Sequence, residues 1–205
     1  MTKMIRQSIQ SGAVQRVHFL GDSITQGSGF VSQQQSYVCQ VMQEIQGLAG
    51  NVDVQVYNHA VGGATSTDGL NRVQWCERDD HQAELVWIMF GLNDLNQGVS
   101  VEEYGVNLGA MIERFLGIGA QVVVCGPTPF AGREDELLDY IQRVADVAGE
   151  ASVPFIECSG PFYEGGNLRP GMLWPDGVHL TAEGHQVLAR HLLEHLFVEE
   201  HTCRS

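Results

Sequence analysis

The chain has few basic side chains. Lysine and arginine together number 11 among 205 residues, against 25 acidic side chains, and the formal net charge is −14. This balance opposes nucleic-acid binding, because such binding needs cations that replace the counterions of the phosphates. It also opposes docking on anionic membrane surfaces. We therefore expect no nucleic-acid partner and no stable association with a membrane.

Long apolar runs are also missing. No window approaches the roughly 20 residues that span a bilayer, and residues 1–16 carry two early cations but no apolar core of a signal peptide. The sequence contains no Pro/Ser-rich linker, low-complexity run or internal repeat. We therefore expect a single domain over residues 1–205 and a cytoplasmic location. A secreted chain trimmed of its signal would look the same.

Cysteine is scarce, and the spacing of the cysteines shows no paired motif. The five cysteines are an odd number, and no two of them form a Cys-x-x-Cys pair. Cys125 and Cys158 lie in or beside apolar runs, so we expect them to be small core residues. A reduced compartment fits this usage best.

Apolar, β-branched runs alternate with segments of helical spacing. The predicted strands are 17–20, 52–57, 85–90, 121–125 and 153–157, and the predicted helices are 37–48, 101–116, 137–148 and one that Thr181 caps. In the third of these helices the predicted buried stripe is Leu138, Ile141, Val144 and Ala145. Strands that alternate with helices indicate right-handed crossovers and a mainly parallel sheet covered on both faces.

Small or polar residues follow the first three predicted strands. Ser23 comes after the first, Gly63 after the second and Asn93 after the third. In a parallel sheet the ligand site lies beyond the carboxyl ends of the strands, so we expect these residues to converge there. Asp176 and His179 precede the last helix and can fold back over the same edge.

These residues could form the catalytic groups of a serine esterase. Ser23 would be the nucleophile, His179 the general base and then acid, and Asp176 the carboxylate that orients the imidazole. Each has an ordinary alternative when taken alone. A serine at a strand–helix junction is usually a helix cap, and Asp176-Gly177 is a common turn. Asp22 is expected to brace the turn by binding backbone amides.

The negative oxygen that forms during attack on an ester requires donors. Asn93 could offer its side-chain amide, and Gly63 and Ser23 their backbone N–H groups. As an alternative, the glycine pair Gly62-Gly63 and the polar residues after the third strand are ordinary turn signals. Asn58 could tie the second of these loops to the third.

Four segments in this order resemble the four sequence blocks of the SGNH (GDSL) hydrolase superfamily: Gly21-Asp22-Ser23, 58–65, 91–94 and 176–179. The resemblance implies a three-layer α/β/α fold with a five-stranded, flavodoxin-like sheet, no cofactor, and hydrolysis through an acyl-enzyme. It implies Ser23, Asp176 and His179 as the triad, and Ser23, Gly63 and Asn93 as the oxyanion donors. A shift of one residue would exchange Gly62 for Gly63.

Other histidines and one tryptophan were candidates for binding. His191 and His195 stand four residues apart, but without a nearby cysteine a solvated helix face is the better interpretation, and it extends to His185 and His201. Trp174 stands two residues before Asp176. It could line the substrate site or simply pack.

The segments flanking the predicted site are mostly polar and contain no long apolar lid. We therefore expect small, soluble substrates, such as short-chain acyl esters or acetylated carbohydrates. A thioesterase or lysophospholipase with the same catalytic groups is the first alternative, and a non-catalytic carbohydrate-binding module is the second. The expected partner is a small-molecule ester, and a homo-oligomer is an open alternative.

Overall fold

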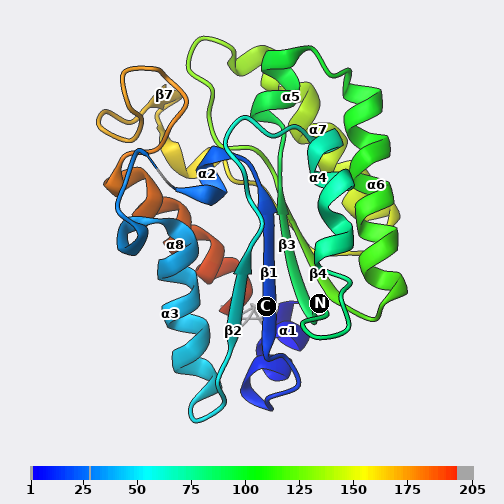
Figure 1. Cartoon of the computed structure of the whole chain (residues 1–205). Helices are drawn as coiled ribbons and strands as arrows, with labels where there is room; N and C mark the ends of the chain where they lie inside the picture. The colour runs from blue at the N-terminus through cyan, green and yellow to red at the C-terminus, as the bar shows by residue number, and fades with distance from the viewer. Residues whose placement is uncertain (1, 28, 198–205) are drawn as a thin grey trace, which may run out of the picture.

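The computed structural model describes residues 2–27 and 29–197, and its centre is a five-stranded parallel sheet (Figure 1). The strands are β1 (Arg16–Gly21), β2 (Gln55–Asn58), β3 (Leu85–Met89), β4 (Gln121–Cys125) and β5 (Phe155–Ile156), in the order β2-β1-β3-β4-β5. Every adjacent pair is parallel, as the sequence predicts. This flavodoxin-like order reverses direction between β1 and β3, where ligands bind in such sheets.

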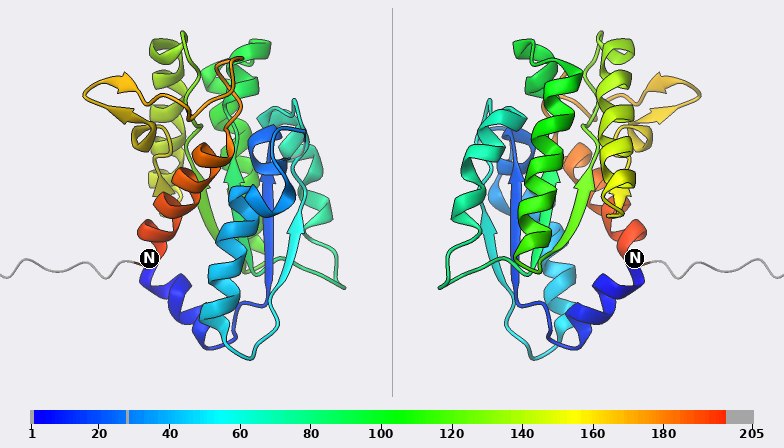
Figure 2. Two further views of the ribbon diagram at one scale, coloured as in Figure 1. Left: turned by 90° about the vertical axis from the view of Figure 1, so that its left-hand side faces the viewer. Right: turned by 90° about the vertical axis from the view of Figure 1, so that its right-hand side faces the viewer.

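Helices cover both faces of the sheet (Figures 1 and 2). One face carries α1 (Thr2–Gln10), α3 (Tyr37–Ala49) and α8 (Ala182–Phe197), and the other carries α4 (Ser66–Arg72), α6 (Val101–Gly117) and α7 (Glu134–Glu150). Shorter elements lie in the connections: α2 (Ser23–Gln26), α5 (Leu92–Gln97), the 3₁₀ turns η1 (Gln33–Gln35), η2 (Val73–Trp75) and η3 (Gly160–Phe162), and the hairpin of β6 (Tyr163–Glu164) and β7 (Asn167–Leu168).

The predicted three-layer arrangement is confirmed, but the buried stripe expected on 137–148 is only partly right, because Val144 is buried as expected and Leu138 is not. Leu138 is 58% exposed, and together with Ile141 it lines a groove beside the β6–β7 hairpin. The buried residues of α7 are Leu137, Tyr140, Val144, Val147 and Ala148. The helix is thus rotated relative to the prediction. The stripe was misplaced because it took Leu138 in place of Leu137 and left out Tyr140, whose ring packs on that of Tyr104.

Side chains from the strands and from both helix layers form the core, which includes the two cysteines expected there. Cys125 and Cys158 are buried, and the cysteines of the described residues (Cys39, Cys76, Cys125 and Cys158) are free thiols. Within the described part of the chain, no helix is both long and apolar enough to cross a membrane.

Candidate active site

Ser23 lies where β1 ends and α2 begins. Asp22 caps this short helix, because its Oδ1 accepts the N–H of Ile24 at 2.9 Å. Gly21 permits the turn, since a Cβ there would lie 2.2 Å from Thr25 Oγ1. The predicted bracing role of Asp22 agrees with this geometry. The turn places Ser23 at the switch point of the sheet.

Three predicted site residues form one hydrogen-bonded chain. Ser23 Oγ lies 2.9 Å from His179 Nε2, and His179 Nδ1 lies 2.8 Å from Asp176 Oδ2. The other oxygen of Asp176 accepts the backbone N–H groups of Val178 and His179, each at 3.0 Å. Partial burial alone would raise the pKa of Asp176, but these hydrogen bonds outweigh it and lower the pKa. The carboxylate therefore stays charged and fixes the imidazole so that Nε2 faces the serine.

The phenyl ring of Phe30 covers the imidazole of His179, and the sequence analysis did not predict this contact. The rings of Phe30 and His179 are stacked, with centroids 3.5 Å apart and planes within 8°. Phe30 stands in a mostly polar segment, and its only signal was that an aromatic side chain is out of place there. The stacking limits rotation of His179 out of line with Ser23.

Asn93 lies in the first turn of α5, directly after β3. Its Nδ2 donates to Oδ2 of Asp22 at 3.4 Å, so one amide N–H is engaged and the second remains for a ligand. Gly91 precedes the helix with a φ of +131°, and a Cβ there would lie 3.1 Å from Pro127. The close approach of these two loops therefore requires glycine at position 91.

The loop after β2 brings the glycine pair toward Ser23. The N–H of Gly62 donates to Gln26 Oε1 at 2.9 Å, whereas Gly63, with a φ of +79°, is held through its carbonyl by Gln97 Nε2 at 2.7 Å. This engagement of Gly62 favours Gly63 as the free donor. The role suggested for Asn58 is wrong, because its Nδ2 donates to the carbonyl of Thr25 in the first loop rather than to the third. Asn58 was misplaced because β1, not β3, is the neighbour of β2 in the sheet.

The catalytic candidates line a small cleft of about 170 Å³. Its lining residues are Ser23, Leu92, Asn93, Asn96, Phe130, Asp176, Val178 and His179. Trp174 is not among them. This residue is 43% exposed, and its main-chain N–H donates to the carbonyl of His179 at 2.7 Å, which closes the turn that carries Asp176 and His179.

The solvated position expected for His185 is wrong. His185 is buried, its Nδ1 accepts the N–H of Tyr37 at 3.2 Å, and its ring stacks on that of Tyr37. Burial lowers its pKa to about 4, so the ring is neutral. His191 is half-buried against the carbonyl of Glu157, His195 is exposed, and His201 lies outside the described residues. The error arose because a helix that packs through histidine looks polar in sequence.

A sequence model of the GDSL-like Lipase/Acylhydrolase family matches residues 19–187. The chain belongs to this family. Two curated relatives are esterases. An acetylxylan esterase of Geobacillus stearothermophilus is 26% identical over 214 residues, covering 92% of this chain and 96% of the relative. An arylesterase of Vibrio mimicus is 29% identical over 152 residues, covering 70% of this chain and 72% of the relative. The protein is thus a GDSL-type serine esterase, a carboxylic ester hydrolase.

Solved structures agree in fold. The crystal structure of Axe2, an acetylxylan esterase from G. stearothermophilus, superposes with a TM-score of 0.76 at 25% identity, covering 90% of this chain and 95% of that one. Variants of Axe2 changed at a serine, at an aspartate, and at a histidine three residues after the aspartate are catalytic mutants. LAE5, an α/β hydrolase from the metagenome of Lake Arreo in Spain, superposes with a TM-score of 0.74 at 20% identity, which supports the fold alone.

Asp22 makes stability depend on pH. Burial, reinforced by the charge of Asp94, raises its pKa from 3.8 to about 7. The unfolded state ionises at the lower pKa while the folded state still holds its proton, so stability falls as pH rises from about 4 to 7. The shift corresponds to a loss of up to about 4 kcal/mol. In Asp22→Asn the fall in the free energy of unfolding between about pH 4 and 7 that is due to Asp22 should vanish.

Chemical denaturation of both proteins across this pH range measures the effect. The difference between the two curves of unfolding free energy against pH gives the contribution of Asp22. It separates this contribution from that of Asp94, whose pKa is also raised by burial. Asp53→Asn, a change at an exposed aspartate, should leave the wild-type slope in place. Parallel curves for wild type and Asp22→Asn would show that Asp22 is already ionised at low pH.

Proposed function

We propose that this esterase works through an acyl-enzyme on Ser23. His179 takes the serine proton as Oγ attacks the ester carbonyl, then donates it to the leaving alcohol; water reverses the roles to release the acid. Asp176 holds the imidazole tautomer and stabilises the imidazolium. The single observation that carries this proposal is the continuous hydrogen-bonded chain from Ser23 Oγ through His179 to Asp176 at the lined cleft.

The oxyanion is proposed to bind three donors: the backbone N–H groups of Ser23 and Gly63 and the side-chain amide of Asn93. Support comes from the geometry of their neighbours. Gln26 occupies the N–H of Gly62, and Asp22 accepts one of the two amide hydrogens of Asn93. Such preorganised donors cost no rearrangement when charge develops, and each is typically worth about 3–4 kcal/mol.

The size of the cleft favours a short acyl group. Sites for drug-sized ligands commonly measure about 300–1,000 Å³, whereas the cleft at Ser23 measures about 170 Å³. A one- or two-carbon acyl group fits such a space more readily than a fatty acyl chain does. The alcohol is proposed to lie toward the exposed turn that carries Trp174.

Acetylated carbohydrates are therefore the proposed substrate class. The acetylxylan esterase relative supports this, since the two chains align over nearly their whole lengths. A tryptophan with 43% of its surface exposed, two residues before Asp176, gives sugar rings an aromatic face on which to stack.

Hydrolysis of p-nitrophenyl acetate, butyrate, octanoate and palmitate, beside acetylated xylan and acetyl-CoA, tests the proposal. We expect kcat/KM to fall at least about tenfold from acetate to octanoate, because one methylene in a hydrophobic pocket is worth about 1–3 kcal/mol and the longer chain has no space. Ser23→Ala supplies the background rate of each ester. A preference for octanoate or palmitate would contradict the short acyl group, and a preference for acetyl-CoA over every oxygen ester would indicate a thioesterase.

A further inference from the structure

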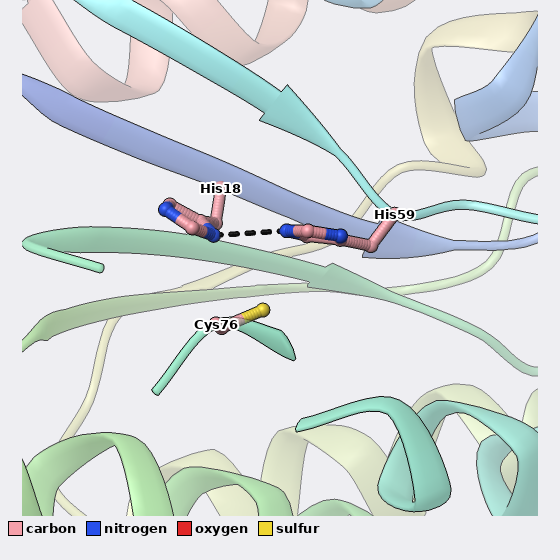
Figure 3. Close-up of side chains that lie close together, drawn as sticks. All are labelled: His18, His59 and Cys76. Atoms are coloured by element: carbon pink, nitrogen blue, oxygen red, sulfur yellow. Dashed lines mark hydrogen bonds between the residues drawn. The ribbon is translucent and has the colours of Figure 1, made fainter. Parts of the chain in front are cut away.

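A second group of reactive side chains lies away from the triad, between the sheet and the α4–η2 segment (Figure 3). It consists of His18 on β1, His59 directly after β2, and Cys76 directly after η2. One ring nitrogen of each histidine and the sulfur of Cys76 all lie within 4.8 Å of one another. His18 and Cys76 are fully buried and His59 is partly buried.

The two imidazoles face each other edge to edge. His18 Nδ1 lies 3.0 Å from His59 Nε2, and Figure 3 shows these nitrogens pointing toward one another. Two imidazoles that share a tetrahedral zinc ion, with Zn–N bonds of about 2.0–2.1 Å, have nitrogens about 3.3 Å apart. A thiolate at about 2.3 Å from the same ion would lie about 3.6 Å from each nitrogen. Small shifts of the three side chains, on the order of 1 Å or less, would therefore complete this geometry.

We propose that His18, His59 and Cys76 form a binding site for a thiophilic transition-metal ion, zinc foremost. Imidazole and thiolate are the ligands that zinc prefers, and a fourth position would be left for water. The ion would stabilise the fold, and no part in ester hydrolysis is assigned to it. His18 is three residues, or about 10 Å, before the end of β1 at which Ser23 begins its turn.

Burial keeps both imidazoles neutral but opposes the thiolate that an ion requires. Burial, reinforced by the neighbouring His59, lowers the pKa of His18 to about 3, and burial also lowers the pKa of His59. Both rings are therefore neutral, which is the form that binds metal. Burial raises the pKa of Cys76 to about 12. Cys76 is thus a thiol when no ion is bound, and an ion would displace its proton, as a coordinating cation deprotonates a thiol outright.

The surroundings orient the ligands and leave a route from solvent. Tyr57 stacks on His18 with ring centroids 4.5 Å apart, which fixes the imidazole plane. The partly buried His59 lies beside Trp75, which is 46% exposed, so an ion could reach the site past these two side chains.

An ion here would add a link among three segments, of which β1 and the loop after β2 are already joined by the hydrogen bond from the N–H of His59 to the carbonyl of Phe19. It would tie β1 to the loop after β2 and to the end of η2. Gly63, the proposed oxyanion donor, stands four residues after His59 in that loop. We expect the ion to stabilise the fold, and binding to the folded state alone should raise Tm by about 5–10 °C at zinc a hundredfold above Kd.

Titration of chelator-treated protein with Co²⁺ tests the site, because cobalt takes the same ligands as zinc and reports them by absorption. The expected result is one ion per chain, with a thiolate-to-cobalt band in the near ultraviolet and the visible bands of tetrahedral cobalt. Cys76→Ser should lose the thiolate band and the zinc-dependent rise in Tm. Cys39→Ser, a change at a free cysteine on α3, should keep both, and so should His179→Asn, which removes the triad histidine as a competing ligand.

X-ray absorption of the wild-type zinc protein does not depend on any variant folding. It should show one sulfur at about 2.3 Å and nitrogen ligands at about 2.0 Å. A shell of nitrogen and oxygen alone would overturn the proposal, as would a thiolate band that survives in Cys76→Ser. Failure of both Co²⁺ and Zn²⁺ to bind would mean that the three residues form only a packed hydrogen-bonded cluster.

Discussion

Ser23→Ala is expected to lower kcat at least about 10⁴-fold while the protein stays folded. Alanine removes the only atom that can form the acyl-enzyme, and the remaining donors can still bind the ester and stabilise its charge. The 2.9 Å contact of Ser23 Oγ with His179 Nε2 is the part of the site that the change destroys. Single-turnover kinetics with p-nitrophenyl acetate measure the loss.

The same reasoning predicts that losses do not add. His179→Ala should cost about as much as Ser23→Ala, and the double variant should be little worse than either, because the triad acts as a unit. A serine-directed phosphonate should label Ser23 alone. Ser32→Ala changes an exposed serine of the following loop and should keep wild-type activity and labelling. Labelling at another residue, or substantial turnover by Ser23→Ala, would contradict the mechanism.

The strands and the convergence of the site could be predicted from the sequence because they depend on local patterns. Apolar runs define the strands, and a parallel sheet brings Ser23 and Asn93 to one edge wherever the helices lie. The distances from Ser23 to His179 and from His179 to Asp176 agree with that expectation. Their catalytic roles stay predictions that the variants above test.

Contacts between distant segments could not be predicted. Phe30 covers His179 across 149 positions of sequence, and nothing in the segment around it indicates which side chain it will meet. His18 in β1 looked like part of a buried strand, and its pairing with His59 depends on the register of β1 with β2. Register and side-chain packing are tertiary properties, and periodicity identifies a face without naming its partner.

The same limit explains the error at Asn58. Its polar side chain indicated a tie between loops, but the choice of loop depended on strand order. Strand β2 is at the edge of the sheet and borders β1 alone, so Asn58 reaches Thr25. Strand alternation predicts a parallel sheet without giving the order of its strands.

Asn93→Ala is expected to lower kcat by about 10²–10³-fold and to change KM little, because the charge that Asn93 is proposed to stabilise exists only in the transition state. The hydrogen bond from Asn93 to Asp22 supports this role, since it fixes the amide before substrate binds. Asn93→Asp should be at least as damaging, because it places a carboxylate where negative charge develops and close to the acidic Asp22. Steady-state kinetics on the acetate ester measure both.

Asn96→Ala is the matched control, because Asn96 also lines the cleft and stands three residues further along α5. It removes an amide of the same kind from the same helix and should leave kcat within a few-fold of wild type. Whether Asn93→Ala changes kcat or KM decides the role of Asn93. A raised KM with unchanged kcat would mean that Asn93 binds the ground state of the substrate, and the oxyanion would then depend on the backbone N–H groups of Ser23 and Gly63 alone.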